Sequence, residues 1–179
     1  AKRGDVHTKA MEKLRSLINV VSHGGNFLLN IGPKGDGSVV PFEREVLKEI
    51  GIWLKKNGEA IYGTEASPFR EQFEWGTITR KGNNLYLILS GNRPADDKIT
   101  LNIPGCKLQK ADIKAIQKGQ EMIFTLPADA YGKDIQVICA TFDQPVKPQP
   151  IAAQRTPNYS YSCFDYYSNY RSTVSYQWS

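Results

Sequence analysis

The pattern of apolar residues in the first sixty positions changes from a helical spacing to a short continuous run. Between Thr8 and Ser22, apolar residues recur every three or four positions, which predicts one buried helical face, and Gly24-Gly25 supplies the end of the helix. These apolar positions are Met11, Leu14, Leu17, Ile18 and Val21. The following run, Phe27 to Ile31 ("FLLNI"), is too short for a helix and is apolar on both of its sides. Such a run is typical of a strand that is covered on both faces.

A second helix is predicted after a glycine-rich loop. Pro41 suits a first helical position, and Asn57-Gly58 suits a helix end. The apolar residues between them again fall on one face, namely Phe42, Val46, Leu47, Ile50, Trp53 and Leu54. The order helix, buried strand, helix is the repeating unit of an α/β fold.

After Thr64 the pattern becomes that of short strands. In the stretch from Ile99 to Ile103, apolar residues alternate with Thr100 and Asn102, as in a half-buried strand. Six segments have strand character, namely 75–79, 85–89, 99–103, 111–116, 122–126 and 135–140. We therefore expect an antiparallel β-sandwich over residues 65–143.

The last part of the chain, residues 144–179, has a different composition. It opens with four prolines in fourteen residues, which predicts a stiff linker. The tail that follows is rich in aromatic residues and Ser. Two interpretations of this tail stay open: the first strand of a further domain, or an aromatic surface that binds a ligand.

Composition excludes some classes of function and site. The chain of 179 residues has a net charge of +5, but it lacks a basic run of the kind that nucleic-acid patches show, so we expect no nucleic-acid partner. It also lacks a run of 18 apolar residues, and we expect no membrane span. His7 and His23 have no metal-ligand spacing and are expected at the surface. The cysteines are expected to be buried or free thiols, without a metal site, and they are Cys106, Cys139 and Cys163.

The loop Gly32 to Gly37 ("GPKGDG") excludes three familiar ligand sites. It lacks the order of glycines and Lys that a P-loop needs, the spaced oxygen ligands of an EF-hand, and the GxGxxG of a dinucleotide site. A tight connection from the carboxyl end of a buried strand into a helix remains. In a (β/α)8 barrel, that end of each strand faces the active site.

The stretch Val20 to Thr64 resembles the closing segment of the catalytic barrel in glycoside hydrolase family 29, the α-L-fucosidases. The family's Ser-x-Gly-Gly-Asn-x-Leu-Leu-Asn-x-Gly-Pro motif is matched by Ser22, Gly24, Gly25, Asn26, Leu28, Leu29, Asn30, Gly32 and Pro33. The stretch "IGIWLKKNGEAIYGT" is similar to the family's final helix and its exit into a C-terminal β-sandwich.

The resemblance implies a fold class of α/β followed by all-β. Residues 1–64 are expected to form the terminal helix-strand-helix unit of a (β/α)8-type barrel, and residues 65–143 an antiparallel β-sandwich. A barrel closes only with eight strands, and this chain supplies one. We therefore expect the chain to need the remainder of the barrel as a partner.

The same resemblance implies a parent enzyme that is a retaining exo-α-L-fucosidase acting on fucosylated glycans. Retention needs two carboxyl groups about 5 Å apart, and the family carries both on earlier strands and loops. No residue of this chain is therefore expected to be catalytic, and the chain alone is expected to be inactive. No cofactor is expected. The family resemblance also implies that the parent enzyme is secreted or periplasmic.

Asn30 is the candidate substrate-binding residue, because it is a polar residue near the carboxyl end of the predicted barrel strand. The alternative is that Asn30 stabilises the turn that follows the strand. Asn26, at the opposite end, is expected to be a turn residue. Asp36, which lies between glycines, is expected to cap its own turn rather than to contact sugar.

Several other side chains admit two interpretations. Trp75 and Tyr86 can stack on a sugar ring or fill a core, and strand alternation favours the core. Three carboxylates are expected on a solvated helical face, namely Glu43, Glu45 and Glu49. An alternative function for the whole chain is a non-catalytic carbohydrate-binding or docking module, and a third is an inactive barrel remnant.

Overall fold

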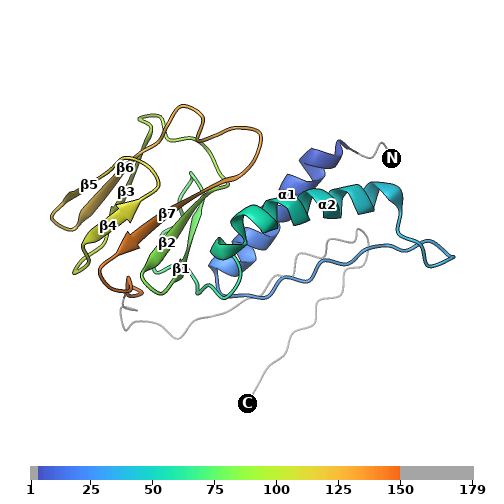
Figure 1. The fold of residues 1–179 in the computed structure, drawn as a ribbon, viewed down its shortest axis with the longest axis horizontal. Helices are drawn as coiled ribbons and strands as arrows, with labels where there is room; N and C mark the ends of the chain where they lie inside the picture. Colours follow the sequence, from blue (N-terminus) through green and yellow to red (C-terminus); the bar gives the residue numbers. More distant parts are fainter. Residues whose placement is uncertain (1–3, 150–179) are drawn as a thin grey trace, which may run out of the picture. The chain divides into compact units, whose positions relative to one another are not determined.

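A computed structural model of the chain describes residues 4–149, which lie in one compact unit (Figure 1). Two helices come first, α1 (Val6–Ser22) and α2 (Pro41–Asn57), and a short 3₁₀ turn, η1 (Gly58–Ala60), follows α2. The strands are β1 (Thr77–Lys81), β2 (Asn84–Leu89), β3 (Lys98–Asn102), β4 (Leu108–Ala111), β5 (Ala115–Lys118), β6 (Glu121–Thr125) and β7 (Gln136–Phe142). The predicted order of two helices followed by an antiparallel all-β part is confirmed. The aromatic tail and Cys163 lie outside the described residues.

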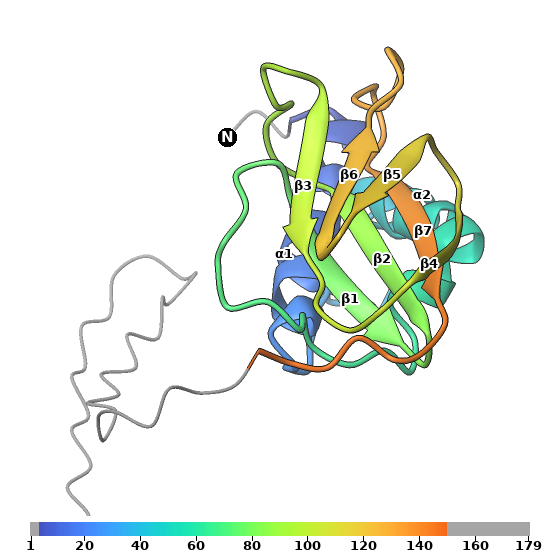
Figure 2. The ribbon, with the colours of Figure 1, turned by 90° about the vertical axis from the view of Figure 1, so that its left-hand side faces the viewer.

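The strands form two antiparallel sheets. One has the order β1-β2-β7-β4, and the other has the order β3-β6-β5. In Figure 2 the three-stranded sheet lies in front of the larger sheet, and the helices lie behind it. The described unit is therefore layered as sheet, sheet, helix pair.

The predicted strand 111–116 is wrong in one respect. The structure divides this stretch between β4 and β5, which belong to different sheets. The division falls at Asp112, whose backbone N–H donates to the Cys139 carbonyl and whose carboxylate accepts from the Cys139 N–H. Because Asp112 is tied to β7 on one side, the chain turns there and crosses to the second sheet.

The main core fills the space between the two sheets. In β2, Leu85, Leu87 and Leu89 point into it. From the opposite sheet it receives Ile99, Leu101, Met122 and Phe124, all at most 1% exposed. The strands β3 and β6 bury only one face, whereas β2 is buried at every position from Leu85 to Leu89.

A second core explains why β2 is buried on both faces. Tyr86 and Ile88 point away from the sandwich and pack against the helix pair. The helices contribute the residues that the period predicts, including Met11, Leu14, Ile18, Val46, Ile50 and Trp53. The helix pair thus covers the outer face of the four-stranded sheet, and the predicted positions of both helices are confirmed.

A close backbone contact before β1 requires glycine. Gly76 has a φ of +151°, and a Cβ built on it would lie 2.0 Å from the Ile88 carbonyl oxygen. A side chain at this position would separate β1 from β2 at the start of their ladder.

The predicted strand Phe27–Ile31 is not seen as a strand in the described structure. This segment has no regular secondary structure and runs alongside the two helices (Figure 1). The physical reason is that a strand exists only through hydrogen bonds to neighbouring strands, and within residues 4–149 none is paired with this segment. Leu28 is 81% exposed and Ile31 is 41% exposed.

Candidate functional site

His7 lies in the first turn of α1, which Asp5 caps. The Asp5 carboxylate accepts from the Thr8 N–H at 3.0 Å, and this bond lowers the pKa of Asp5. His7 precedes Met11 by four residues, so its side chain is placed on the buried face of the helix. The expectation that His7 lies at the surface holds only in part, because its side chain is 15% exposed.

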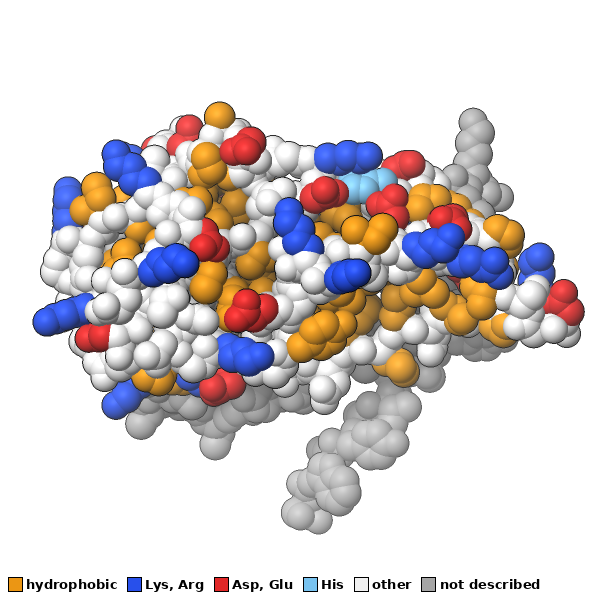
Figure 3. All heavy atoms as spheres, in the orientation of Figure 1, with side chains coloured by type: hydrophobic (Ala, Val, Ile, Leu, Met, Phe, Trp, Pro, Cys, Tyr) orange, Lys and Arg blue, Asp and Glu red, His pale blue; other side chains and the backbone are white. Residues whose placement is uncertain are grey.

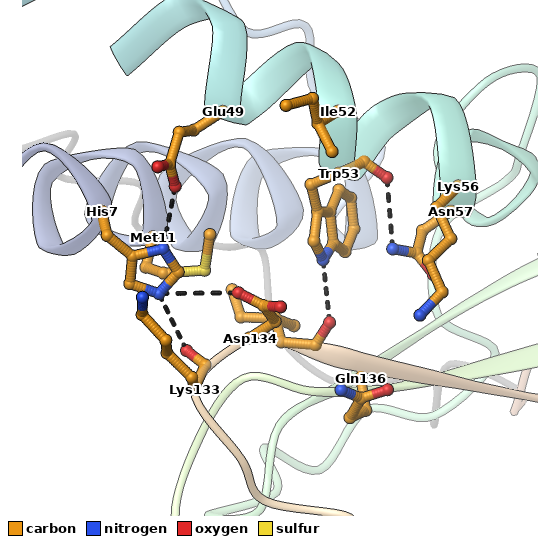
Figure 4. Close-up of a pocket in the computed structure, with 11 residues that line it drawn as sticks. His7, Met11, Glu49, Ile52, Trp53, Lys56, Asn57, Lys133, Asp134 and Gln136 are labelled. Carbon is orange, nitrogen blue, oxygen red and sulfur yellow. Dashed lines mark hydrogen bonds and ion pairs between the residues drawn. The ribbon is translucent and has the colours of Figure 1, made fainter. Parts of the chain in front are cut away.

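Three acceptors surround the His7 ring (Figure 4). Its Nδ1 lies 2.8 Å from Glu49 Oε2 on α2, and its Nε2 lies 3.1 Å from the Lys133 carbonyl oxygen. Asp134 Oδ1 lies 3.5 Å from the same Nε2. The Lys133 carbonyl and the Glu49 carboxylate raise the pKa of His7, while partial burial and the Lys133 charge oppose this rise.

Glu49 is therefore not simply a member of a solvated face. Its carboxylate joins α2 to α1 through His7. Glu43 also has a specific role, since its Oε2 accepts from the Gly32 N–H at 3.2 Å. Glu45 does match the expectation, because it is exposed and pairs with Lys48, one turn away on the same helix.

A cavity of about 350 Å³ between the helix pair and the start of β7 is lined by His7, Met11, Glu49, Lys133 and Asp134 (Figure 4). We call it the junction pocket, and its other lining residues include Ile52, Trp53, Lys56, Asn57, Ile135 and Gln136. The Trp53 indole donates to the buried Ile135 carbonyl at 2.8 Å. The pocket therefore sits at the seam where the helices are fastened to the sandwich.

The junction pocket does not have the chemistry of a glycosidase site. Its two carboxylates, Glu49 and Asp134, both face the same imidazole, so neither is set up as a nucleophile opposite a separate acid. No group of three His, Cys, Asp or Glu side chains in residues 4–149 is arranged for a metal ion. Cys106 and Cys139 are free thiols whose pKa values burial raises, which disfavours a nucleophilic role.

Asn30, the predicted substrate-binding residue, lies on the unpaired segment beside the helices. Leu29 packs against the helical core, whereas Leu28 and Asn30 are exposed. Asn30 borders a cavity of about 210 Å³ over α1 and α2, together with Leu29, Ile31, Phe42, Val46 and Leu47. Figure 3 shows hydrophobic side chains exposed in a band across this helical part of the molecule.

Asp36 caps its own turn, as expected. Its carboxylate accepts from the Ser38 N–H at 2.9 Å and from the Ser38 hydroxyl at 2.7 Å, and these bonds lower its pKa. Gly37, with a φ of +80°, completes the turn, and a bridge between Pro33 and Val39 closes the loop. The loop is thus held by its own hydrogen bonds.

The expectation that Trp75 and Tyr86 fill cores is confirmed. Trp75 is 8% exposed and its ring stacks on Phe73, and Tyr86 is 2% exposed on the helix side of β2. Burial raises the pKa of Tyr86 to about 12. Neither ring is available to stack on a sugar.

Neither helix of the described part is long and apolar enough to cross a membrane.

In sequence, the N-terminal part of the chain is similar to α-L-fucosidases. The family model described as alpha-L-fucosidase matches residues 2–59. Human tissue α-L-fucosidase is 46% identical over 85 residues, which is 45% of this chain and 18% of that protein. Human plasma α-L-fucosidase is 35% identical over 117 residues, covering 62% of this chain and 24% of that protein.

Solved structures extend the match into the sandwich. An α-L-fucosidase from Vibrio sp. strain EJY3 superimposes with a TM-score of 0.69 and 27% identity, over 79% of this chain and 27% of that chain. A GH29 α-L-fucosidase from Bacteroides thetaiotaomicron superimposes with a TM-score of 0.66 and 28% identity, over 75% of this chain and 32% of that chain. The chain thus spans only about a fifth to a third of the relatives that it matches. Within these limits, the predicted resemblance to the C-terminal part of a family 29 α-L-fucosidase is confirmed.

Proposed function

Since the chain matches the C-terminal part of glycoside hydrolase family 29 α-L-fucosidases, we propose that it is the closing part of such an enzyme. The parent hydrolyses terminal α-L-fucosyl residues of glycans and retains the anomeric configuration. Residues 1–64 supply the last helix-strand-helix unit of its catalytic (β/α)8 barrel. Residues 65–143 supply a β-sandwich that buttresses the barrel.

One observation carries the proposal, namely the unpaired segment Phe27–Ile31. Its side chains already alternate as in a barrel strand, with Leu29 packed on the helices and Leu28 and Asn30 on the uncovered side. An apolar segment with an 81% exposed Leu28 is not a stable surface element. Neighbouring strands of a barrel would satisfy its backbone and cover this side.

The chemistry of the parent would come from outside this chain. A retaining glycosidase uses one carboxylate as nucleophile and another carboxyl group as acid and base, and water later hydrolyses the covalent sugar intermediate. A structure of the related Bacteroides thetaiotaomicron enzyme holds a trapped covalent intermediate in complex with 2-fluoro-fucosyl fluoride, which supports this mechanism for the family. No residue of this chain is assigned a catalytic role.

Within the proposed barrel, Asn30 would face the sugar pocket from the carboxyl end of the last strand. Its amide can donate to and accept from sugar hydroxyls or a catalytic carboxylate. The sandwich offers less support for the alternative of a carbohydrate-binding module, because Trp75 and Tyr86 are buried.

The test compares two proteins: the 179-residue chain, and the longer polypeptide in which the other barrel strands precede it, here called the complete enzyme. We expect the complete enzyme to hydrolyse a chromogenic α-L-fucoside and to release the α-anomer first, as followed by proton NMR. We expect the chain alone to release no fucose. Hydrolysis by the chain, or a complete enzyme inert towards α-L-fucosides, would reject the proposal.

A matched pair of variants tests Asn30 in the complete enzyme. Asn30→Ala is expected to lower kcat/KM about tenfold, the equivalent of one hydrogen bond of roughly 1.4 kcal/mol. Asn26→Ala, at the opposite end of the segment, should leave kcat/KM unchanged. Equal effects of the two substitutions would assign Asn30 to the turn.

A further inference from the structure

We propose that His7 is a proton-dependent clamp, which holds α1 to α2 and to the segment before β7 while its ring is protonated. The proposal concerns the junction pocket and does not depend on the fucosidase assignment. Three parts of the chain meet at this ring: the first turn of α1, the middle of α2, and residues 133–134.

The geometry requires two N–H groups on the ring. A carboxylate and a backbone carbonyl can only accept hydrogen bonds, and Glu49 Oε2 and the Lys133 carbonyl lie on opposite ring nitrogens at 2.8 Å and 3.1 Å. Only the histidinium donates to both. A neutral ring must turn a lone pair towards one of these oxygens, so the loss of the proton removes one link of the clamp.

The charges around the ring mostly favour the cation. Glu49 faces it from α2 and Asp134 from the segment before β7, and the N-cap residue Asp5 adds a nearby negative charge. The Lys133 ammonium group opposes it, and Lys56 of α2 lines the same cavity. The Lys133 carbonyl and the Glu49 carboxylate outweigh partial burial and the Lys133 charge, and the pKa of His7 is raised.

The direction of the pH effect follows from this shift. The stability that the clamp adds is fully present below the pKa of an unfolded histidine, about 6.5, and is lost as the pH rises through the higher folded pKa. The hydrogen bond from the Trp53 indole to the Ile135 carbonyl involves no titratable group, so it is kept at high pH. Deprotonation of His7 therefore weakens the contact between the helices and the sandwich without separating them.

Nuclear magnetic resonance of the imidazole protons tests the clamp directly, because the 179-residue chain has only two histidines. In the variant His23→Gln, His7 is the one remaining histidine of the 179-residue chain, so the imidazole signal that persists is assigned to it. We expect His7 to titrate above 6.5, the ordinary histidine value. Glu49→Gln should lower its pKa, whereas Lys133→Ala should raise it, since the backbone acceptor is kept and the opposing charge is removed.

Thermal unfolding supplies the second readout. The Tm difference between the unmodified chain and His7→Gln should be largest near pH 5 and should fall as the pH rises through the titration of His7. If His7→Gln does not fold, the pKa of His7 measured by NMR in the unmodified chain and in Glu49→Gln still tests the clamp. A His7 pKa at or below its ordinary value, or one unmoved by both Glu49→Gln and Lys133→Ala, would overturn the proposal.

Discussion

The strand β2 and the segment Phe27–Ile31 are both short apolar runs with hydrophobic residues on both sides. In β2 the backbone is paired on both edges, with β1 and β7, and both faces are buried. The segment Phe27–Ile31 has one side against the helices, and its backbone is unpaired within the described residues. The same sequence pattern therefore forms a hydrogen-bonded strand only where the chain itself supplies the neighbouring strands.

The largest expected effect distinguishes the sandwich core, into which β2 packs, from the exposed side of the segment Phe27–Ile31. Phe124→Ala removes a ring that is 0% exposed between the sheets, and it should lower the free energy of unfolding by about 3–5 kcal/mol. Leu28→Ala should change it by less than about 0.5 kcal/mol in the 179-residue chain, because Leu28 is 81% exposed. Urea unfolding followed by circular dichroism measures both.

The comparison changes in the complete enzyme. There Leu28 would be buried by the other barrel strands, and Leu28→Ala should then cost about 2–5 kcal/mol. A Leu28 that stays energetically silent in the complete enzyme would show that the segment is not a barrel strand.

A smaller effect is expected at the seam between the helix pair and the sandwich. Trp53→Phe keeps the buried ring but leaves the Ile135 carbonyl without its indole donor. We expect a loss of about 1–3 kcal/mol in the free energy of unfolding. Ile52→Ala is the control, because Ile52 neighbours Trp53 on α2 but is 71% exposed, and it should change stability by less than about 0.5 kcal/mol. Similar losses in both variants would mean that the indole bond does not fasten the seam.

The smallest effect is expected in the loop that follows the segment. Asp36→Ala removes both bonds to Ser38, and it should shift backbone NMR signals of residues 33–39 without changing the Tm. Ser38→Ala keeps the backbone bond and should shift fewer signals. A large fall in Tm on Asp36→Ala would show that this loop supports more than its own turn.

Local sequence patterns were sufficient for the helices and for most strands. The spacing of Met11, Leu14 and Ile18 gave the buried face of α1, and the alternation around Leu101 gave β3. The stretch 111–116 was harder, because apolar residues continue through the turn at Asp112. The bond from Asp112 to Cys139, 27 residues away, leaves no local mark in the sequence.

The site was less predictable than the fold. His7 and Glu49 are 42 residues apart, and their contact depends on how α1 and α2 pack. A signal was present, since His7 is one helical turn before Met11 on the apolar face of α1. Asn30 stays a prediction, because the partners proposed for it are not among the described residues.

Hydrogen exchange of the backbone amides of residues 27–31 tests the central claim most directly. We measure it by mass spectrometry in the 179-residue chain and in the complete enzyme, with the amides of β2 as the internal reference. The account predicts rapid exchange of the segment in the chain alone, and protection close to that of β2 in the complete enzyme. Protection in the chain alone, or rapid exchange in both proteins, would contradict it.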